Sequence, residues 1–168
     1  MNAQILKPLL KQWDAAVVAW NTANKDGQRH LTEVANSATA LGFLNSSSSV
    51  ASSLGPAIAE AAEVRVYDTL LREHRALVMS VDGLRAAVRS MSSVADAVAK
   101  SFRSAEKGST KGSLTVAPTL VTHDVESLSF LLKDAVAMYQ AQLTVCESVS
   151  EEMRPDFARA ASSNTLTL

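Results

Sequence analysis

Apolar residues recur along the chain at alternating steps of three and four residues. From about residue 2 to 43 the repeating positions, including two that are not apolar, are Leu6, Leu10, Trp13, Val17, Trp20, Asn24, Gly27, Leu31, Val34, Ala38 and Leu41. This spacing repeats every seven residues and places the side chains on one face of an α-helix, as in a coiled coil. The pattern predicts one long helix with a continuous seam.

Two later stretches show the same repeat. The most regular seam in the chain consists of Leu70, His74, Leu77, Val81, Leu84, Val88, Met91, Ala95, Val98 and Phe102, with Tyr67 before it. A third seam consists of Leu132, Val136, Tyr139, Leu143, Cys146 and Met153, preceded by Val125 and Leu128. Together the three seams predict helices over about 2–43, 56–103 and 122–153.

Turn-forming residues separate these stretches. Serines and Gly55 precede Pro56, so Gly55 is a candidate N-cap and Pro56 suits the first helical position. Thr122 is a candidate N-cap for the third helix, and Pro155 marks its end. We therefore predict one helical domain over 1–154, with linkers at 44–55 and 104–121 and a flexible tail at 155–168.

The lengths of the helices favour an all-α fold. Two long helices joined by a short linker fold most simply as an antiparallel hairpin, with the third helix alongside. The expected architecture is an elongated antiparallel hairpin or three-helix coiled-coil bundle. Such a bundle leaves part of its seams uncovered, which predicts pairing with a helical partner as a homodimer or heterodimer.

The only two tryptophans, Trp13 and Trp20, lie one heptad apart and so project from the same face. They are candidate anchors in a seam. Asn24 and Gly27 interrupt the same seam: a single polar residue can fix helix register, and a glycine allows close approach of a neighbour. The alternative is a hinge or helix break near Gly27. The packing interpretation is favoured because the heptad phase continues beyond it.

Composition and charge narrow the function classes. Hydrophobic residues make up 47% of the chain and aromatic residues only 5%, which favours closely packed helices. Net charge is −1, with 16 basic and 17 acidic residues interspersed, so direct binding to nucleic acid is disfavoured. No signal peptide is recognisable, and the apolar runs are shorter than the ~20 residues of a membrane helix. These features predict a soluble intracellular protein that is not secreted.

No motif for chemistry stands out. His30, His74 and His123 do not form the Glu-x-x-His pairs of a metal bundle, and the single Cys146 has no evident base beside it. The GSTKG stretch at 108–112 lacks the spacing of a phosphate loop. We therefore predict that the protein is not an enzyme and uses no metal or cofactor.

Several short motifs follow one another in the order seen in a known family. They are Trp13 and Trp20 with Thr22, Asn24, Gly27 and Val34-Ala35-Asn36; Asp82-Gly83-Leu84 with Met91; Pro118-Thr119; and Met138-Tyr139 with Leu143. Over residues ~10 to ~153 the chain resembles the cyclin-dependent kinase 2-interacting protein family. The resemblance makes Trp13, Trp20, Asn24, Gly27, Leu84, Met91, Met138 and Tyr139 the candidates for partner-binding or seam positions.

The resemblance implies a non-catalytic nuclear adaptor, with a cytoplasmic pool also compatible. Members of that family are associated with cyclin-dependent and origin-firing kinases and with checkpoint signalling in replication. With a protein of the related casein kinase 2 substrate family, they also join AAA ATPases that act in ribosome maturation and replisome turnover. The alternative function is a structural coiled-coil subunit of a cytoskeletal, tethering or kinetochore-like assembly.

Overall fold

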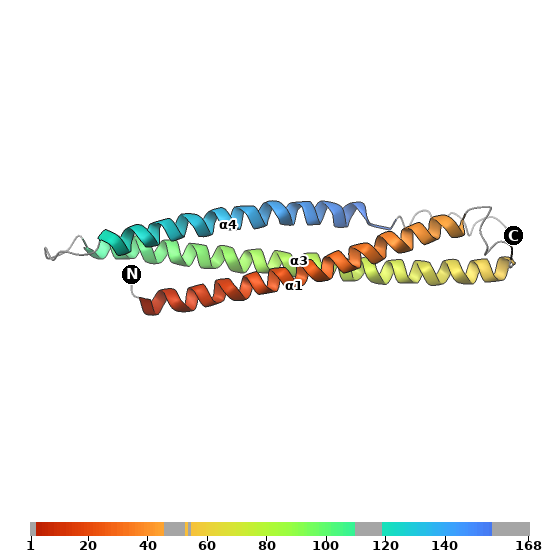
Figure 1. Ribbon diagram of the computed structural model, residues 1–168, viewed down its shortest axis with the longest axis horizontal. Helices are drawn as coiled ribbons and strands as arrows, with labels where there is room; N and C mark the ends of the chain where they lie inside the picture. Colours follow the sequence, from red (N-terminus) through yellow and green to blue (C-terminus); the bar gives the residue numbers. More distant parts are fainter. Residues whose placement is uncertain (1–2, 46–52, 54, 110–118, 156–168) are drawn as a thin grey trace. The chain divides into compact units, whose positions relative to one another are not determined.

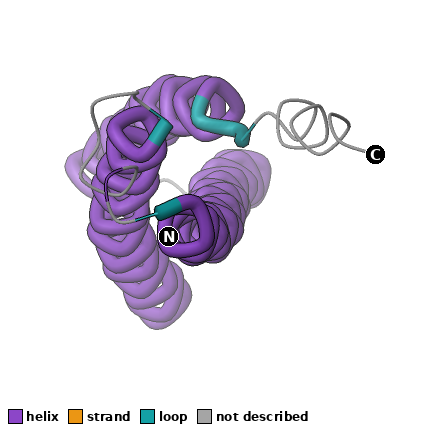
Figure 2. Tube along the Cα trace, turned by 90° about the vertical axis from the view of Figure 1, so that its right-hand side faces the viewer, coloured by secondary structure: helices purple, strands orange, loops and turns teal. Residues whose placement is uncertain are grey.

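The computed structural model describes residues 3–45, 53, 55–109 and 119–155, and almost all of them are helical (Figure 1). Its elements are α1 (Ala3–Leu44), α3 (Pro56–Ser109) and α4 (Thr119–Glu152). The tube in Figure 2 shows helices joined to short loops, and no strand occurs in the described ranges. The predicted all-α fold class is confirmed.

The helix boundaries agree with the sequence prediction at four of six ends to within a residue or so. However, α3 continues to Ser109, because Ala105, Glu106 and Lys107 are good helix formers. α4 begins at Thr119, so Thr122 lies inside the helix and its assignment as N-cap is wrong. No glycine or proline stands between those two threonines to delay the start of the helix. Most of the two predicted linkers and the predicted tail lie outside the described residues.

The start of α3 follows the predicted capping. Gly55 adopts a φ of 108°, a conformation that favours glycine, and Pro56 is the first helical residue. The Gly55 carbonyl accepts hydrogen bonds from the backbone N–H groups of Ile58 and Ala59, both at 3.2 Å. Gly55 therefore serves as the N-cap of α3.

Contacts gather the chain into two compact units, and every helix contributes to both. The first unit contains Met1–Asn24 and Asp82–Val145, and the second contains Lys25–Val81 and Cys146–Leu168. The units are thus not successive segments of the sequence. The prediction of a single domain over 1–154 stays a prediction.

α3 supplies more of the buried side chains in each unit than α1 or α4 does. The apolar seam positions that are buried are Leu70, Leu77, Val81, Leu84, Val88, Met91, Ala95 and Val98. In the first unit, Ala16 and Trp20 of α1 and Leu132, Val136 and Leu143 of α4 are buried as well. The heptad pattern of α3 therefore identifies eight buried positions correctly. It misses Ala87, Val94 and Ala99, which are buried as well. Two predicted seam residues, Tyr67 and His74, are only half-buried.

The seam of α1 is rotated slightly from the predicted one. Ala16 and Ser37 are buried, whereas Val17 is half-buried and Ala38 is exposed. The seam assignment of Ala38 is therefore wrong. At both places the buried residue lies three positions after the preceding seam residue, Trp13 or Val34, and not four as predicted. The two residues found there, Ala16 and Ser37, are small. Small side chains allow neighbouring helices to approach more closely.

Within the second unit, α1 and α3 run antiparallel. Gly27 of α1 lies beside Ser80, and further along α1 the His30 side chain contacts Glu73. As residue numbers rise along α1, those of the contacting residues in α3 fall. This order is the one expected for an antiparallel hairpin.

We predict that Met91→Ala lowers the free energy of unfolding by about 2–5 kcal/mol, because it opens a cavity in a packed core. The Met91 side chain is 0% exposed. The matched control is Met79→Ala on the same helix, where the side chain is 73% exposed; its effect should stay within about 0.5 kcal/mol. Denaturant unfolding followed by circular dichroism measures both, and equal effects would contradict this placement of the core.

Candidate functional site

Trp20 lies in the interior of the first unit. Its side chain is 2% exposed, and its ring packs against Tyr139 of α4 in an edge-to-face arrangement, with centroids 5.0 Å apart and planes at 66°. Aromatic pairs favour this geometry because the positive ring edge meets the negative face. The pair therefore joins α1 to α4 within the protein itself, and Trp20 is not displayed to solvent.

Trp13, one heptad earlier, is only half-buried. The two tryptophans thus share a face of α1 but not an environment. Asn24 is also half-buried, and no hydrogen bond joins its side chain to another described residue. Because water can reach its amide, Asn24 does not need a protein partner and does not supply the contact expected to fix register.

The predicted close approach occurs at a different glycine. A Cβ placed on Gly27 would lie 3.5 Å from the Cβ of Ser80, an ordinary contact, and α1 continues through Gly27 without interruption. A Cβ on Gly83 of α3 would lie only 3.2 Å from the Cβ of Ala23. The tight contact between α1 and α3 therefore depends on Gly83, and Gly27 neither breaks α1 nor is required by a close neighbour.

A polar cluster joins α1 to α3 in the second unit. His30 donates from Nδ1 to Oε2 of Glu73 at 2.8 Å, and Arg72 donates from Nε to Oε1 of the same carboxylate at 3.1 Å. Arg29 lies with a guanidinium nitrogen 3.1 Å from Nε2 of His30. Since a guanidinium can only donate, Nε2 is the acceptor and Nδ1 carries the proton. The hydrogen bond from His30 to Glu73 thus joins α1 to α3 by a polar contact in the second unit.

The cluster affects the acidity of its carboxylate. Hydrogen bonds from His30 and then from Arg72 hold the pKa of Glu73 below its ordinary value of 4.5, against a smaller opposing effect of burial. Stabilisation of the ionised carboxylate is a contribution to folding that exists only while Glu73 is ionised. The charged state of Glu73 and the pairing of the two helices are therefore linked.

His74 and Cys146, two candidates for chemistry in the sequence, each lie in an environment that the structure defines. Nε2 of His74 donates a hydrogen bond to the Ser150 carbonyl oxygen at 3.3 Å, which ties α3 to the end of α4. Cys146 is half-buried, and burial, followed by the charge of Glu147, raises the pKa of its thiol. A raised pKa keeps the sulfur as a thiol, which is the less reactive form. Neither environment is typical of a catalytic residue.

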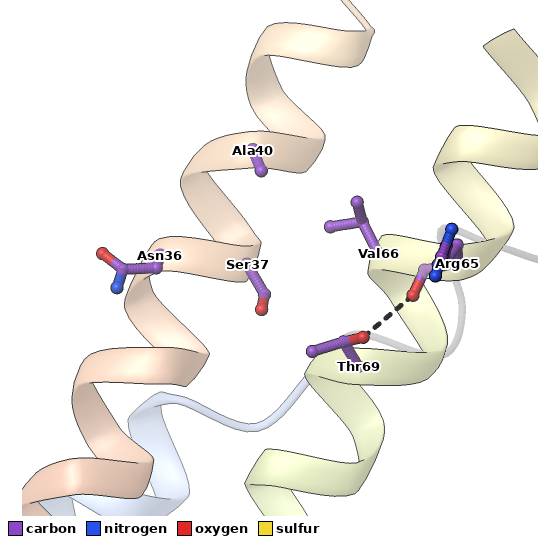
Figure 3. Close-up of a pocket in the computed structure, with 6 residues that line it drawn as sticks. All are labelled: Asn36, Ser37, Ala40, Arg65, Val66 and Thr69. Atoms are coloured by element: carbon purple, nitrogen blue, oxygen red, sulfur yellow. Dashed lines mark hydrogen bonds between the residues drawn. The ribbon is translucent and has the colours of Figure 1, made fainter.

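A shallow groove of about 350 Å³ lies between α1 and α3 in the second unit (Figure 3). Ser37 and Ala40 project from α1 toward Val66 and Thr69 of α3, while Asn36 points away from α3. The Thr69 hydroxyl already donates to the backbone carbonyl of Arg65 at 3.0 Å. The residues that line this groove include two hydroxyl side chains, an amide and one arginine, and no histidine, cysteine or carboxylate is among them.

The remaining sequence candidates divide between the core and the surface. Leu84 and Met91 of α3 are buried, with exposures of 2% and 0%. Met138, by contrast, is 74% exposed, although its neighbour Tyr139 packs on Trp20. Met138 therefore belongs to no interhelical seam of this chain, and it stays a candidate only for contact with another protein.

Met138 is part of a larger apolar surface that the sequence analysis missed. Leu131, Met138 and Val145 follow one another at heptad spacing along α4, and they are 65%, 74% and 62% exposed. We call these three residues the open stripe. The buried seam of α4, with Leu132, occupies a different face of the same helix. The heptad spacing of the open stripe is present in the sequence, but it runs beside the longer seam of Leu132, Val136, Tyr139, Leu143 and Cys146.

No protein-family model matches the sequence, and no curated protein or solved structure matches it either. Among the described residues, no helix has a stretch apolar and long enough to cross a membrane. Within the same parts of the chain, no three His, Cys, Asp or Glu side chains are grouped as a metal ion would require. The interhelical seams and the open stripe are thus the features on which a function can be argued.

We predict a coupling of about 0.5–1.5 kcal/mol between Trp20 and Tyr139 in a double-mutant cycle with Trp20→Leu and Tyr139→Leu, because each substitution removes one ring of the edge-to-face pair. Chemical denaturation of the four proteins measures it. The same cycle with Trp13→Leu in place of Trp20→Leu is the control and should be additive. A coupling near zero for the Trp20 cycle would show that the rings do not interact.

We also predict that Glu73→Gln destabilises the protein at neutral pH and that this effect shrinks as the pH falls. The folded-state pKa of Glu73 is lowered, so its contribution is present above about pH 4.5 and is lost as the pH falls through the lowered value. Denaturation at a series of pH values tests this expectation. Glu63→Gln, at an exposed position of the same helix, is the control. A destabilisation by Glu73→Gln that is independent of pH would argue against the linkage.

Proposed function

We propose that this protein is a non-catalytic adaptor that holds a helical partner against α4. The observation that carries the proposal is the open stripe. Leu131, Met138 and Val145 are large apolar side chains on one face of α4, and each is more than half exposed. Anchors at heptad spacing are typical of helix-in-groove and coiled-coil recognition. A regular apolar row on a surface marks an interaction site more strongly than scattered apolar residues do.

The division of α4 into two faces supports the same function. Tyr139 contacts Trp20 of α1, whereas the adjacent Met138 is directed to solvent. The buried face thus fixes α4 in the first unit, and the open stripe remains available on a helix that is already ordered. A preformed helix loses little conformational entropy when it binds, which favours affinity.

The resemblance described for the sequence supports a more specific proposal. A nuclear adaptor of this kind would connect its helical partner to a cyclin-dependent kinase or an AAA ATPase complex in replication or ribosome maturation. What favours this proposal over a purely structural coiled-coil subunit is the order of the tryptophan, Asp-Gly-Leu and Met-Tyr motifs. It requires no metal or cofactor.

The proposal is tested by replacing the open stripe in a tagged protein expressed in cells. The open-stripe variant is Leu131→Gln, Met138→Gln and Val145→Gln. The control variant, which replaces exposed apolar residues elsewhere, is Val18→Gln, Val64→Gln and Met79→Gln. Quantitative affinity purification should recover a cyclin-dependent kinase or an AAA ATPase with the wild type and the control variant. Recovery should fall at least about tenfold with the open-stripe variant, as expected when anchor residues are lost.

Circular dichroism and thermal unfolding should show that both variants remain folded, because all six side chains are exposed. Fluorescence microscopy of the tagged wild type should give a nuclear signal. Undiminished recovery with the open-stripe variant would refute the proposed role of α4. A filament or organelle signal would favour the structural subunit instead.

A further inference from the structure

The last turns of α4 run antiparallel to α3 in the second unit. α3 and α4 enter this unit at Val81 and Cys146, respectively. Deeper in the unit, the His74 ring donates its hydrogen bond to the carbonyl oxygen of Ser150. Residue numbers therefore fall along α3 while they rise along α4. The end of α4 is thus directed along α3 toward Tyr67, which lies one heptad before His74.

The seam of α3 is incompletely covered near the point where α4 stops. Leu70 is buried, whereas Tyr67, the preceding position of the same seam, is only half-buried. α4 ends at Glu152, while α3 extends to Pro56. A large aromatic side chain of the α3 seam therefore remains partly open to water. Because burial of apolar surface is favourable, a further side chain placed over Tyr67 would stabilise the fold.

The chain does not leave the protein surface at the end of α4. The residues from Glu151 to Arg154 are exposed, but Pro155, which follows them, is buried. Proline has no backbone N–H and is a common residue just after a helix ends. The predicted flexible tail therefore begins with a residue that is shielded from water.

The sequence after Pro155 contains one aromatic residue, Phe157, and it continues the spacing of the α4 seam. Phe157 comes one heptad after Ser150, just as Tyr67 comes one heptad before His74. On α3 this separation is about 10 Å. From Ser150 to Phe157 the chain spans about 10 Å if it is helical, and roughly 14 Å if the last two residues are extended. Phe157 can therefore reach the level of Tyr67.

On these grounds we propose that the chain's own segment after Pro155 covers this end of the seam, with Phe157 packed on Tyr67 of α3. The inference does not depend on the adaptor function. It adds an internal contact that takes the place of a third helix beyond the end of α4. A helix of another protein that binds there would first have to displace Phe157.

The covalent connection favours this occupant over a separate molecule. A short tether from Pro155 holds the Phe157 ring near Tyr67 at an effective concentration on the order of millimolar, so that one apolar contact is enough to populate the packed state. A second protein has no such advantage and must bury about 1,200–2,000 Å² in a stable interface. One half-buried tyrosine offers far less area than that.

The test uses the full chain, which contains only two tyrosines, Tyr67 and Tyr139. Acetylation with N-acetylimidazole, followed over time by peptide mass spectrometry, gives a separate rate for each hydroxyl group. Phe157→Ser should accelerate the modification of Tyr67 at least about threefold, as expected if Phe157 covers it for about two-thirds of the time. Tyr139, which packs on Trp20 in the first unit, is the internal control and should keep its rate.

A matched control variant tests whether the effect belongs to Phe157. Leu166→Ser removes another large apolar side chain from the same segment and should leave the rate at Tyr67 unchanged. Equal rates at Tyr67 in the wild type and Phe157→Ser, or an equal acceleration by Leu166→Ser, would overturn the inference. Acceleration at both tyrosines would indicate a general loosening of the helices and would also overturn it. Protection of Tyr67 that increases with protein concentration would show that a second copy provides the cover, with the same consequence.

Discussion

The fold depends on burial of the apolar seam of α3. Val88, Met91 and Val98 cannot be shielded from water by their own helix, since a single helix covers only its backbone. Each buried side chain of this size contributes about 1.5–3 kcal/mol when it leaves water, and so the seam requires neighbours along its length. α1 and α4 supply them, with Trp20 and Leu132 buried in the first unit. The polar contacts between the helices and the exposed face of α4 are compatible with this burial.

Polar contacts then select among the ways in which the helices could pack. Apolar seams are tolerant of sliding, because leucine and valine fit many similar positions. The hydrogen bond between His30 and Glu73 forms only when two particular turns of α1 and α3 lie together. Likewise, the close contact of Ala23 with Gly83 fits only one alignment of the helices. Hydrophobic burial thus drives association, whereas these few contacts determine which alignment is most stable.

The parts of this structure that could be predicted are those in which many residues repeat one signal. The seam of α3 was predicted from Leu70 to Val98 because each heptad repeats the same choice of an apolar residue. Features that depend on single contacts between distant segments could not be predicted in this way. The choice between Ala38 and Ser37 depends on how α1 is rotated, and that rotation is decided by neighbours the local pattern does not encode. The same reason explains why Gly83 rather than Gly27 marks the close approach.

α4 contains six acidic residues and one lysine, and this excess of negative charge affects how the protein meets others before any contact forms. The total charge of −1 suggests a molecule with almost no long-range electrostatic attraction. A cation within about 10 Å of the surface, however, responds to the nearest charges and not to their sum, because salt screens the more distant ones. Approaching proteins would therefore be oriented by α4 at moderate ionic strength. The rate of association with other proteins is then expected to depend on salt concentration more steeply than a net charge of −1 suggests.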